Sequence, residues 1–140
     1  MLYAETSCLV ATLVEGSHSP IARRWFSSGD TVAASIVVFP EAHSAIERLR
    51  RGGVLSDSQA EDARDQLEAW WRVCRPVVVD AARAADMVRA HGLRALDAIH
   101  LAAALTLSDV SPSLRVASFD RQLCAAAATE GLTVLDVDAP

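Results

Sequence analysis

The 140-residue chain contains no lysine, and all thirteen of its basic residues are arginine. A Walker A phosphate loop, a Schiff-base enzyme and a phospho-receiver domain each require a lysine, so these three classes are excluded. The six glycines form no GxGxxG motif, which excludes a dinucleotide-binding fingerprint. The four histidines show neither HxH nor HExxH spacing, so the sequence gives no indication of a zinc site.

Disulfides, membrane spans and secretion are not indicated either. The three cysteines are odd in number and set among apolar neighbours, so we expect small core residues in a reducing cytoplasm. No apolar run reaches about 18 residues without a charge, which argues against a membrane span. Glu5 and Glu15 interrupt the N-terminal apolar stretch, which argues against a signal peptide. We therefore expect one cytoplasmic domain over residues 1–140.

Short apolar runs alternate with longer amphipathic segments along the chain. The apolar runs predict strands at residues 2–5, 31–35, 76–79, 114–119 and 132–135. The amphipathic segments predict helices at residues 6–14, 19–28, 37–51, 57–74, 80–91, 95–107 and 120–130. Helix N-caps are expected at Thr6 or Ser7, at Asp57 or Ser58, at Asp80 and at Asp120. This alternation predicts an α/β fold with a mostly parallel sheet covered on both faces.

Two adjacent tryptophans lie in the helix expected at residues 57–74. Neighbouring residues on a helix lie about 100° apart, so Trp70 and Trp71 cannot both lie at the centre of its apolar stripe. They indicate either a wide core face or a tryptophan that faces another protein. Hydrophobic residues make up 51% of the chain, and part of this excess is expected to be buried against another chain.

Four acidic residues lie where strands end or helices begin. Glu5 closes the first expected strand, Glu41 lies just inside the helix after the second, and Asp120 follows RVASF. Asp97 begins a strongly apolar helix in LRALDAIHLAAAL. Because sites in parallel sheets form at the carboxyl ends of the strands, we expect these carboxylates to lie together. Taken singly, each of two acids has a simpler explanation. Asp120 could be an ordinary N-cap, and Glu41 could be an acid in the first helical turn that the helix dipole favours.

Clustered carboxylates need a counter-charge. Two of them about 4 Å apart repel by about 4 kcal/mol at an effective dielectric constant of 20. The chain has no lysine, and we expect no arginine from the motifs around these acids, so either some carboxyls are protonated or a divalent cation neutralises them. An open site of carboxylate oxygens suits Mg²⁺ or Mn²⁺, which activate water and stabilise the charge on a phosphodiester.

Four blocks follow one another along nearly the whole chain: YAETSCLVATLV, SIVVFPEAHSAI, LRALDAIHLAAAL and ASFDRQLCAAAATEGL. Together they resemble the PIN-domain ribonucleases, in particular the VapC toxins of bacterial type II toxin–antitoxin pairs. The resemblance implies a three-layer α/β/α sandwich with a five-stranded, mostly parallel sheet. It further implies an endoribonuclease that depends on Mg²⁺ or Mn²⁺, forms a homodimer, and is inhibited by a small VapB-type antitoxin in a heterotetramer or larger complex.

The resemblance also implies site residues. By position, the catalytic and metal-binding acids are Glu5, Glu41, Asp97 and Asp120. The hydroxyls expected to orient these carboxylates or a metal-bound water are those of Thr6, Ser7 and Ser118. The family normally has aspartate where this chain has Glu5, whose extra methylene adds about 1.5 Å of reach. Since Mg²⁺ requires near-octahedral geometry, two functions stay open: a nuclease with a modified site, or a catalytically weakened PIN-fold protein that engages an antitoxin or RNA without efficient cleavage.

Basic residues and a histidine near these motifs have simpler explanations as well. His100 follows Asp97 by three residues and could lie beside it on the helix. A histidine general base is conceivable there, but a metal-bound hydroxide makes one unnecessary, so we expect a structural or hydrogen-bonding role. Three arginines end the helix that Glu41 begins: Arg48, Arg50 and Arg51. Their charge complements the helix dipole, and contact with RNA phosphates is a second use that the sequence leaves open.

Overall fold

Five short strands form one sheet in the order β3-β2-β1-β4-β5, and every neighbouring pair is parallel. The structure is a computed structural model that describes residues 1–137. Its strands are β1 (Leu2–Ala4), β2 (Val32–Ser35), β3 (Arg75–Val77), β4 (Arg115–Ala117) and β5 (Thr133–Val134). The predicted five-stranded parallel sheet is therefore confirmed.

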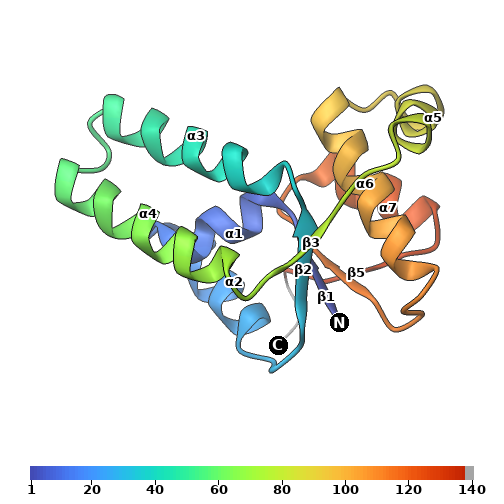
Figure 1. The fold of residues 1–140 in the computed structure, drawn as a ribbon, viewed down its shortest axis with the longest axis horizontal. Coiled ribbons are helices and arrows are strands. Elements are labelled where there is room, and N and C mark those ends of the chain that lie inside the picture. The colour runs from blue at the N-terminus through green and yellow to red at the C-terminus, as the bar shows by residue number, and fades with distance from the viewer. Residues whose placement is uncertain (138–140) are drawn as a thin grey trace.

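Helices cover both faces of the sheet. Those within the described residues are α1 (Thr6–Leu13), α2 (Ser19–Phe26), α3 (Val38–Arg51), α4 (Asp57–Trp71), α5 (Ala81–His91), α6 (Ala95–Ser108) and α7 (Arg121–Thr129). Helices α1 to α4 lie on one side of the sheet and α5 to α7 on the other, which confirms the three-layer sandwich (Figure 1). None of the helices within residues 1–137 combines the length and apolarity that a membrane span needs.

The central strand β1 is apolar because it is buried on both faces. Its three residues are fully buried, and successive side chains point to opposite sides of the sheet. Tyr3 packs in a cluster with Val77 and Val116, whereas Leu2 packs in a cluster with Trp25 and Cys8. A strand buried in this way ends at Glu5, so a carboxylate is placed at the middle of the sheet edge.

Helix starts follow local hydrogen bonding. The N-caps predicted at Asp80 and Asp120 are confirmed, since each side chain accepts backbone N–H bonds from the first turn of its helix. The cap predicted for α4 is wrong, because Ser56 rather than Asp57 or Ser58 occupies that position. Ser56 forms a reciprocal capping box with the glutamine three residues later, which satisfies two backbone donors at once.

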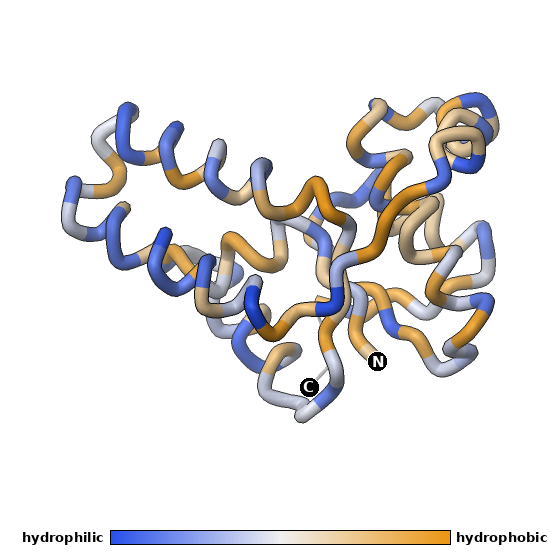
Figure 2. Tube along the Cα trace, in the orientation of Figure 1, coloured by the Kyte–Doolittle hydropathy of each residue, from blue (hydrophilic) through white to orange (hydrophobic). Residues whose placement is uncertain are grey.

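Helices α3 and α4 form a hairpin that extends away from the sheet, with hydrophilic residues along much of its outer surface (Figures 1 and 2). Trp70 and Trp71 are both partly buried against the same apolar cluster. Trp71 stacks on Phe39 at a ring-centroid distance of 5.1 Å, and Trp70 lies 6.5 Å from Phe26. Within this chain the two tryptophans therefore widen the core face of α4.

All three cysteines are free thiols. Cys8 and Cys74 are buried in two different apolar clusters, and Cys124 is half-buried. Burial raises the pKa of Cys74 to about 12 and also raises the pKa of Cys8 and of Cys124. The expected role as a small core residue is confirmed for Cys8 and Cys74, whereas Cys124 lies outside these clusters.

Candidate active site

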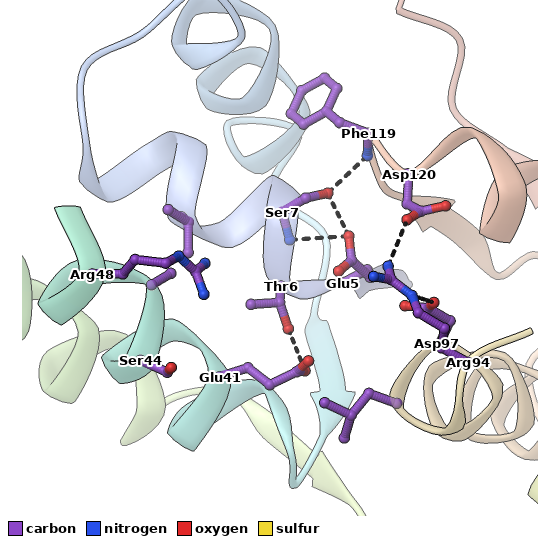
Figure 3. Close-up of a pocket in the computed structure, with 13 residues that line it drawn as sticks. Glu5, Thr6, Ser7, Glu41, Ser44, Arg48, Arg94, Asp97, Phe119 and Asp120 are labelled. Carbon is purple, nitrogen blue, oxygen red and sulfur yellow. Dashed lines mark hydrogen bonds and ion pairs between the residues drawn. The ribbon is translucent and has the colours of Figure 1, made fainter. Parts of the chain in front are cut away.

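A cavity of about 600 Å³ lies where β1, β2 and β4 give way to the following helices. Its lining includes carboxylates from four elements: Glu5, Glu41, Asp97 and Asp120. The structure thus brings together the acids that the sequence placed at one edge of the sheet. Two arginines, Arg48 and Arg94, share the wall, and Figure 3 shows Arg94 beside Glu5, Asp97 and Asp120.

Glu5 is buried and held by three donors. Its Oε2 atom accepts bonds from the Ser7 backbone N–H at 3.0 Å, from the Ser118 hydroxyl at 2.8 Å and from the Ser7 hydroxyl. The first of these bonds makes Glu5 the N-cap of α1, so the cap predicted at Thr6 or Ser7 is wrong. Within residues 1–137 no hydrogen bond ends on Oε1, which leaves that oxygen able to bind another group.

The two serines also join the turn after β1 to the turn after β4. The Ser7 hydroxyl oxygen accepts the backbone N–H of Phe119 at 2.9 Å, and the Ser118 hydroxyl oxygen accepts the backbone N–H of Asp120 at 3.0 Å. Each hydroxyl therefore donates to Glu5 and accepts a backbone N–H of the turn after β4. Ser7 and Ser118 thus both contact the Glu5 carboxylate, and a part in orienting it stays a prediction.

Glu41 lies in the first turn of α3 and is held by two buried partners. Its Oε2 atom accepts from the Thr6 hydroxyl at 2.7 Å and from His100 Nε2 at 2.7 Å. Burial raises the pKa of Glu41, but the hydrogen bonds from His100 and Thr6 outweigh it and leave this pKa lowered. Glu41 is therefore kept as an anion at the cavity wall.

His100 belongs to this network rather than to Asp97. Its side chain is 1% exposed, and its Nδ1 atom lies 2.9 Å from the hydroxyl of the fully buried Tyr3. The ring contacts Tyr3 and Glu41, and within residues 1–137 no hydrogen bond joins it to Asp97, three residues earlier on α6. Its expected hydrogen-bonding role matches these contacts.

Asp97 and Asp120 share one arginine. Arg94 Nε donates to Asp97 Oδ2 at 2.9 Å, and Arg94 Nη2 lies 3.8 Å from Asp120 Oδ2. The expectation that the motifs supply no arginine is wrong, since Arg94 stands in the same block as Asp97, at the i,i+3 spacing that brings helical side chains together. That spacing is the signal that sequence reasoning missed.

The arginines at the end of α3 divide into two groups. Arg48 lines the cavity. Arg50 and Arg51 do not line it; they form ion pairs with Glu47 at 2.9 and 2.8 Å, and Arg50 also pairs with Asp57. The hydrogen bonds from Arg50 and Arg51 lower the pKa of Glu47 to about 2.

The donor set fits an oxygen-binding cation by its chemistry. The side chains on the cavity wall that suit Mg²⁺ or Mn²⁺ are carboxylates, with hydroxyls beside them. Glu5 and Glu41 are held by separate partners, whereas Asp97 and Asp120 share Arg94. Within residues 1–137 no three Asp, Glu, His or Cys side chains are gathered closely enough to hold a metal ion. Arg94 would therefore compete with a cation for Asp97 Oδ2 and Asp120 Oδ2.

Comparison with known proteins agrees with this architecture. The PIN domain family model matches residues 2–129. Ribonuclease VapC45 and Ribonuclease VapC49, both from Mycobacterium tuberculosis, are each 34% identical to this chain over 137 residues, which cover 96% of this chain and 94% of the relative.

Solved structures show the same fold at lower identity. FitAcB from Neisseria gonorrhoeae has a TM-score of 0.68 at 20% identity and covers 98% of both chains. Mycobacterium tuberculosis VapC20, described as a Sarcin-Ricin loop cleaving toxin, has a TM-score of 0.63 at 18% identity, covering 90% of this chain and 95% of that one. The extent of these matches leads to one conclusion: the chain belongs to the PIN-domain family, as a relative of the VapC proteins.

Proposed function

We propose that this protein is an endoribonuclease that depends on Mg²⁺ or Mn²⁺ and acts as the toxin of a toxin–antitoxin pair. The observation that carries the proposal is the convergence of four carboxylates from separate elements on one cavity. The 34% identity to two proteins named as VapC ribonucleases supports the same reaction class. RNA phosphodiester cleavage is the chemistry that such a site suits best.

The residues take different parts in this proposal. Asp97, Asp120 and Glu5 would hold the cation, and Glu41 would complete the acidic wall. When bound, the cation lowers the pKa of a bound water and stabilises charge on the phosphate. The serine hydroxyls fix Glu5, and His100 and Thr6 fix Glu41, so these carboxylates are positioned before the substrate arrives.

Two arginines provide positive charge for the RNA backbone. Arg48 is on the cavity wall, and Arg94 is 80% exposed, so its guanidinium can turn from the acids toward a phosphate. An arginine that neutralises acids in the absence of metal and binds phosphate in its presence would explain how a chain of net charge −5 binds RNA at this point.

The metal site is tested with Asp97→Asn. Because Mg²⁺ that binds the folded state raises the melting temperature, the wild type should gain thermal stability across the millimolar range of Mg²⁺. Asp97→Asn should lose most of that gain, and RNA cleavage should fall by about 100-fold or more. Asp62→Asn, the same change at an exposed position on α4, is the matched control and should retain both.

Two results would contradict the assignment. One is a wild-type melting temperature that ignores both Mg²⁺ and Mn²⁺. The other is an Asp97→Asn protein that cuts RNA as fast as the Asp62→Asn control.

A weakened, binding-only protein is the second candidate, and the hydrogen bonding of Glu5 favours it. Three donors already converge on Oε2 of a side chain one methylene longer than the usual aspartate. Glu5→Asp and Glu5→Gln separate the two functions in one RNA-cleavage assay on purified, antitoxin-free protein. For a nuclease we expect Glu5→Asp to cut at least as fast as wild type and Glu5→Gln to lose activity. If all three proteins are inert while antitoxin binding persists, the binding function replaces the nuclease.

We also propose a homodimer that binds a VapB-type antitoxin. Solved structures with this fold include a toxin–antitoxin complex from Klebsiella pneumoniae and VapBC2 from Rickettsia felis. The chain exposes apolar side chains beside the edge strand β3, with Val73 78% and Val78 76% exposed, and such surfaces favour association. Light scattering of the isolated protein at micromolar concentration should give the dimer mass; a monodisperse monomer contradicts the proposal.

A further inference from the structure

An aromatic stack stands beside the acid-lined cavity. The Phe119 ring is nearly parallel to two others: His18, at a centroid distance of 4.2 Å and an angle of 10°, and Trp25, at 4.9 Å and 20°. Two parallel rings at such distances occupy opposite faces of Phe119. Trp25 is 7% exposed whereas His18 is exposed, so the stack begins in the core and ends in solvent at the His18 ring.

Phe119 is fixed to the same residues that hold the acids. Its backbone N–H donates to the Ser7 hydroxyl, and its neighbours in the chain are Ser118, which donates to Glu5, and Asp120. Figure 3 shows its ring at the edge of the site, turned away from the carboxylates. The stack is therefore held at a constant position next to the acidic wall.

Phe119 also lines a second cavity of about 430 Å³, together with His18 and Arg121. Arg121 is the first residue of α7 and is exposed. A cation at a helix N-terminus opposes the helix dipole, and among residues 1–137 no ion pair involves Arg121. Its charge is therefore available for an anion bound beside the aromatic stack.

We propose that the stack is a subsite for a single-stranded RNA nucleotide next to the scissile phosphate. The nucleobase packs on the exposed face of His18, which Phe119 and Trp25 support from behind, and Arg121 contacts the phosphate of that nucleotide. Aromatic faces combined with cationic side chains are the usual means of binding single-stranded RNA. This proposal rests on the ribonuclease function above and adds the residues that bind the strand outside the cleavage site.

The test is a steady-state comparison of variants on a single-stranded RNA oligonucleotide. Since loss of a stacked base contact weakens binding by about 5- to 150-fold, His18→Ala should raise KM by that factor and change kcat little. His18→Phe keeps an aromatic face and should restore KM. Arg121→Gln should raise KM and make it less dependent on salt, because one phosphate contact is lost. His43→Ala is the matched control: His43 also contacts an aromatic ring, Phe39, but lines neither cavity.

An abasic substrate makes the test specific for stacking. After the cleavage site is mapped, the base of each flanking nucleotide is removed in turn. At one position, removal should raise KM for the wild type and have little further effect on His18→Ala, because both changes delete the same contact.

The possible outcomes distinguish a failure of the stacking subsite from a failure of the proposed ribonuclease function. If the wild type cuts RNA but His18→Ala matches the His43→Ala control on every substrate, the stacking subsite is wrong and the nuclease stands. If the wild type neither binds nor cuts RNA, both proposals fail. If His18→Ala weakens only the binding of an antitoxin, the aromatic stack is a protein-binding surface and the subsite is again wrong.

Discussion

Removal of one buried hydroxyl should destabilise the whole domain. Tyr3 and His100 are 0% and 1% exposed, and Tyr3→Phe deletes the hydroxyl that lies 2.9 Å from His100 Nδ1. Burial raises the pKa of Tyr3, so its hydroxyl stays protonated. The Glu41 carboxylate can only accept, so we assign a ring proton of His100 to Nε2 and the Tyr3 hydroxyl as the donor to Nδ1. The variant leaves Nδ1 as a buried acceptor without a donor.

The expected effect follows from the size of that loss. An unsatisfied buried polar group costs about 1–3 kcal/mol. Unfolding entropy is about 2.1 cal/mol/K per residue, or about 0.3 kcal/mol/K for a chain of 140 residues. Tyr3→Phe should therefore lower the melting temperature by about 3–10 °C. Ser58→Ala, which deletes an exposed hydroxyl, should change it by less than about 2 °C.

A double-mutant cycle attributes the loss to this hydrogen bond. In a His100→Leu background the acceptor is already absent, so Tyr3→Phe should then have a much smaller effect. Thermal unfolding followed by circular dichroism measures all four proteins. An equal loss in both backgrounds, or no loss in the wild-type background, would refute the buried network and with it the orientation of Glu41.

Three further results are expected. Arg50 and Arg51 lower the pKa of Glu47 from 4.5 to about 2, so its ion pairs stabilise the fold fully above pH 4.5 and lose this effect as the pH falls toward 2. Glu47→Gln should therefore lower the melting temperature at pH 7. The difference in melting temperature from wild type should shrink below pH 4.5. In the native protein at pH 8, iodoacetamide should label Cys124 before Cys8 or Cys74, as peptide mass spectrometry would show, because only Cys124 is partly exposed. Arg94→Gln removes a cation that competes for Asp97 and Asp120, so thermal stabilisation should require less Mg²⁺; a requirement for more Mg²⁺ would assign Arg94 a supporting role.

The architecture could be predicted because it depends on local pattern. Each expected strand overlaps an observed one; the pattern predicts the first, for example, over residues 2–5, and it runs over Leu2–Ala4. Short apolar runs separated by helices leave few arrangements other than a parallel sheet covered on both faces. The N-cap residues are harder to predict from the sequence. At the start of α4, Ser56, Asp57 and Ser58 are all suitable N-caps, and only the capping box formed by Ser56 distinguishes it from the other two.

The partners of the site residues could not be read from the sequence in the same way. The sequence predicts that the four acids lie together because the carboxyl ends of parallel strands meet at one edge of the sheet. This prediction needs no knowledge of side-chain directions. The partners of His100 depend on how α6 packs across the sheet against β1 and α3, a relation that no spacing along the chain encodes. The i,i+3 spacing of helical side chains predicts the pair between Arg94 and Asp97. The proximity of Arg94 to Asp120 depends instead on the placement of α7.

Glu5 links the fold and the site in one side chain. The Glu5 carboxylate accepts the backbone N–H of Ser7, so its side chain folds back along the start of α1. The extra methylene of Glu5 therefore carries its carboxylate less than about 1.5 Å farther into the cavity than the carboxylate of an aspartate. The same carboxylate reaches the Ser118 hydroxyl, and its backbone N–H donates to Ala117 O at 3.0 Å, so Glu5 ties β1 to β4. An aspartate ends one carbon earlier and reaches Ser118 less well, so the Glu5→Asp protein should melt at a lower temperature than wild type even where it cuts RNA faster. The glutamate at this position is thus explained by the connection that it makes between two central strands.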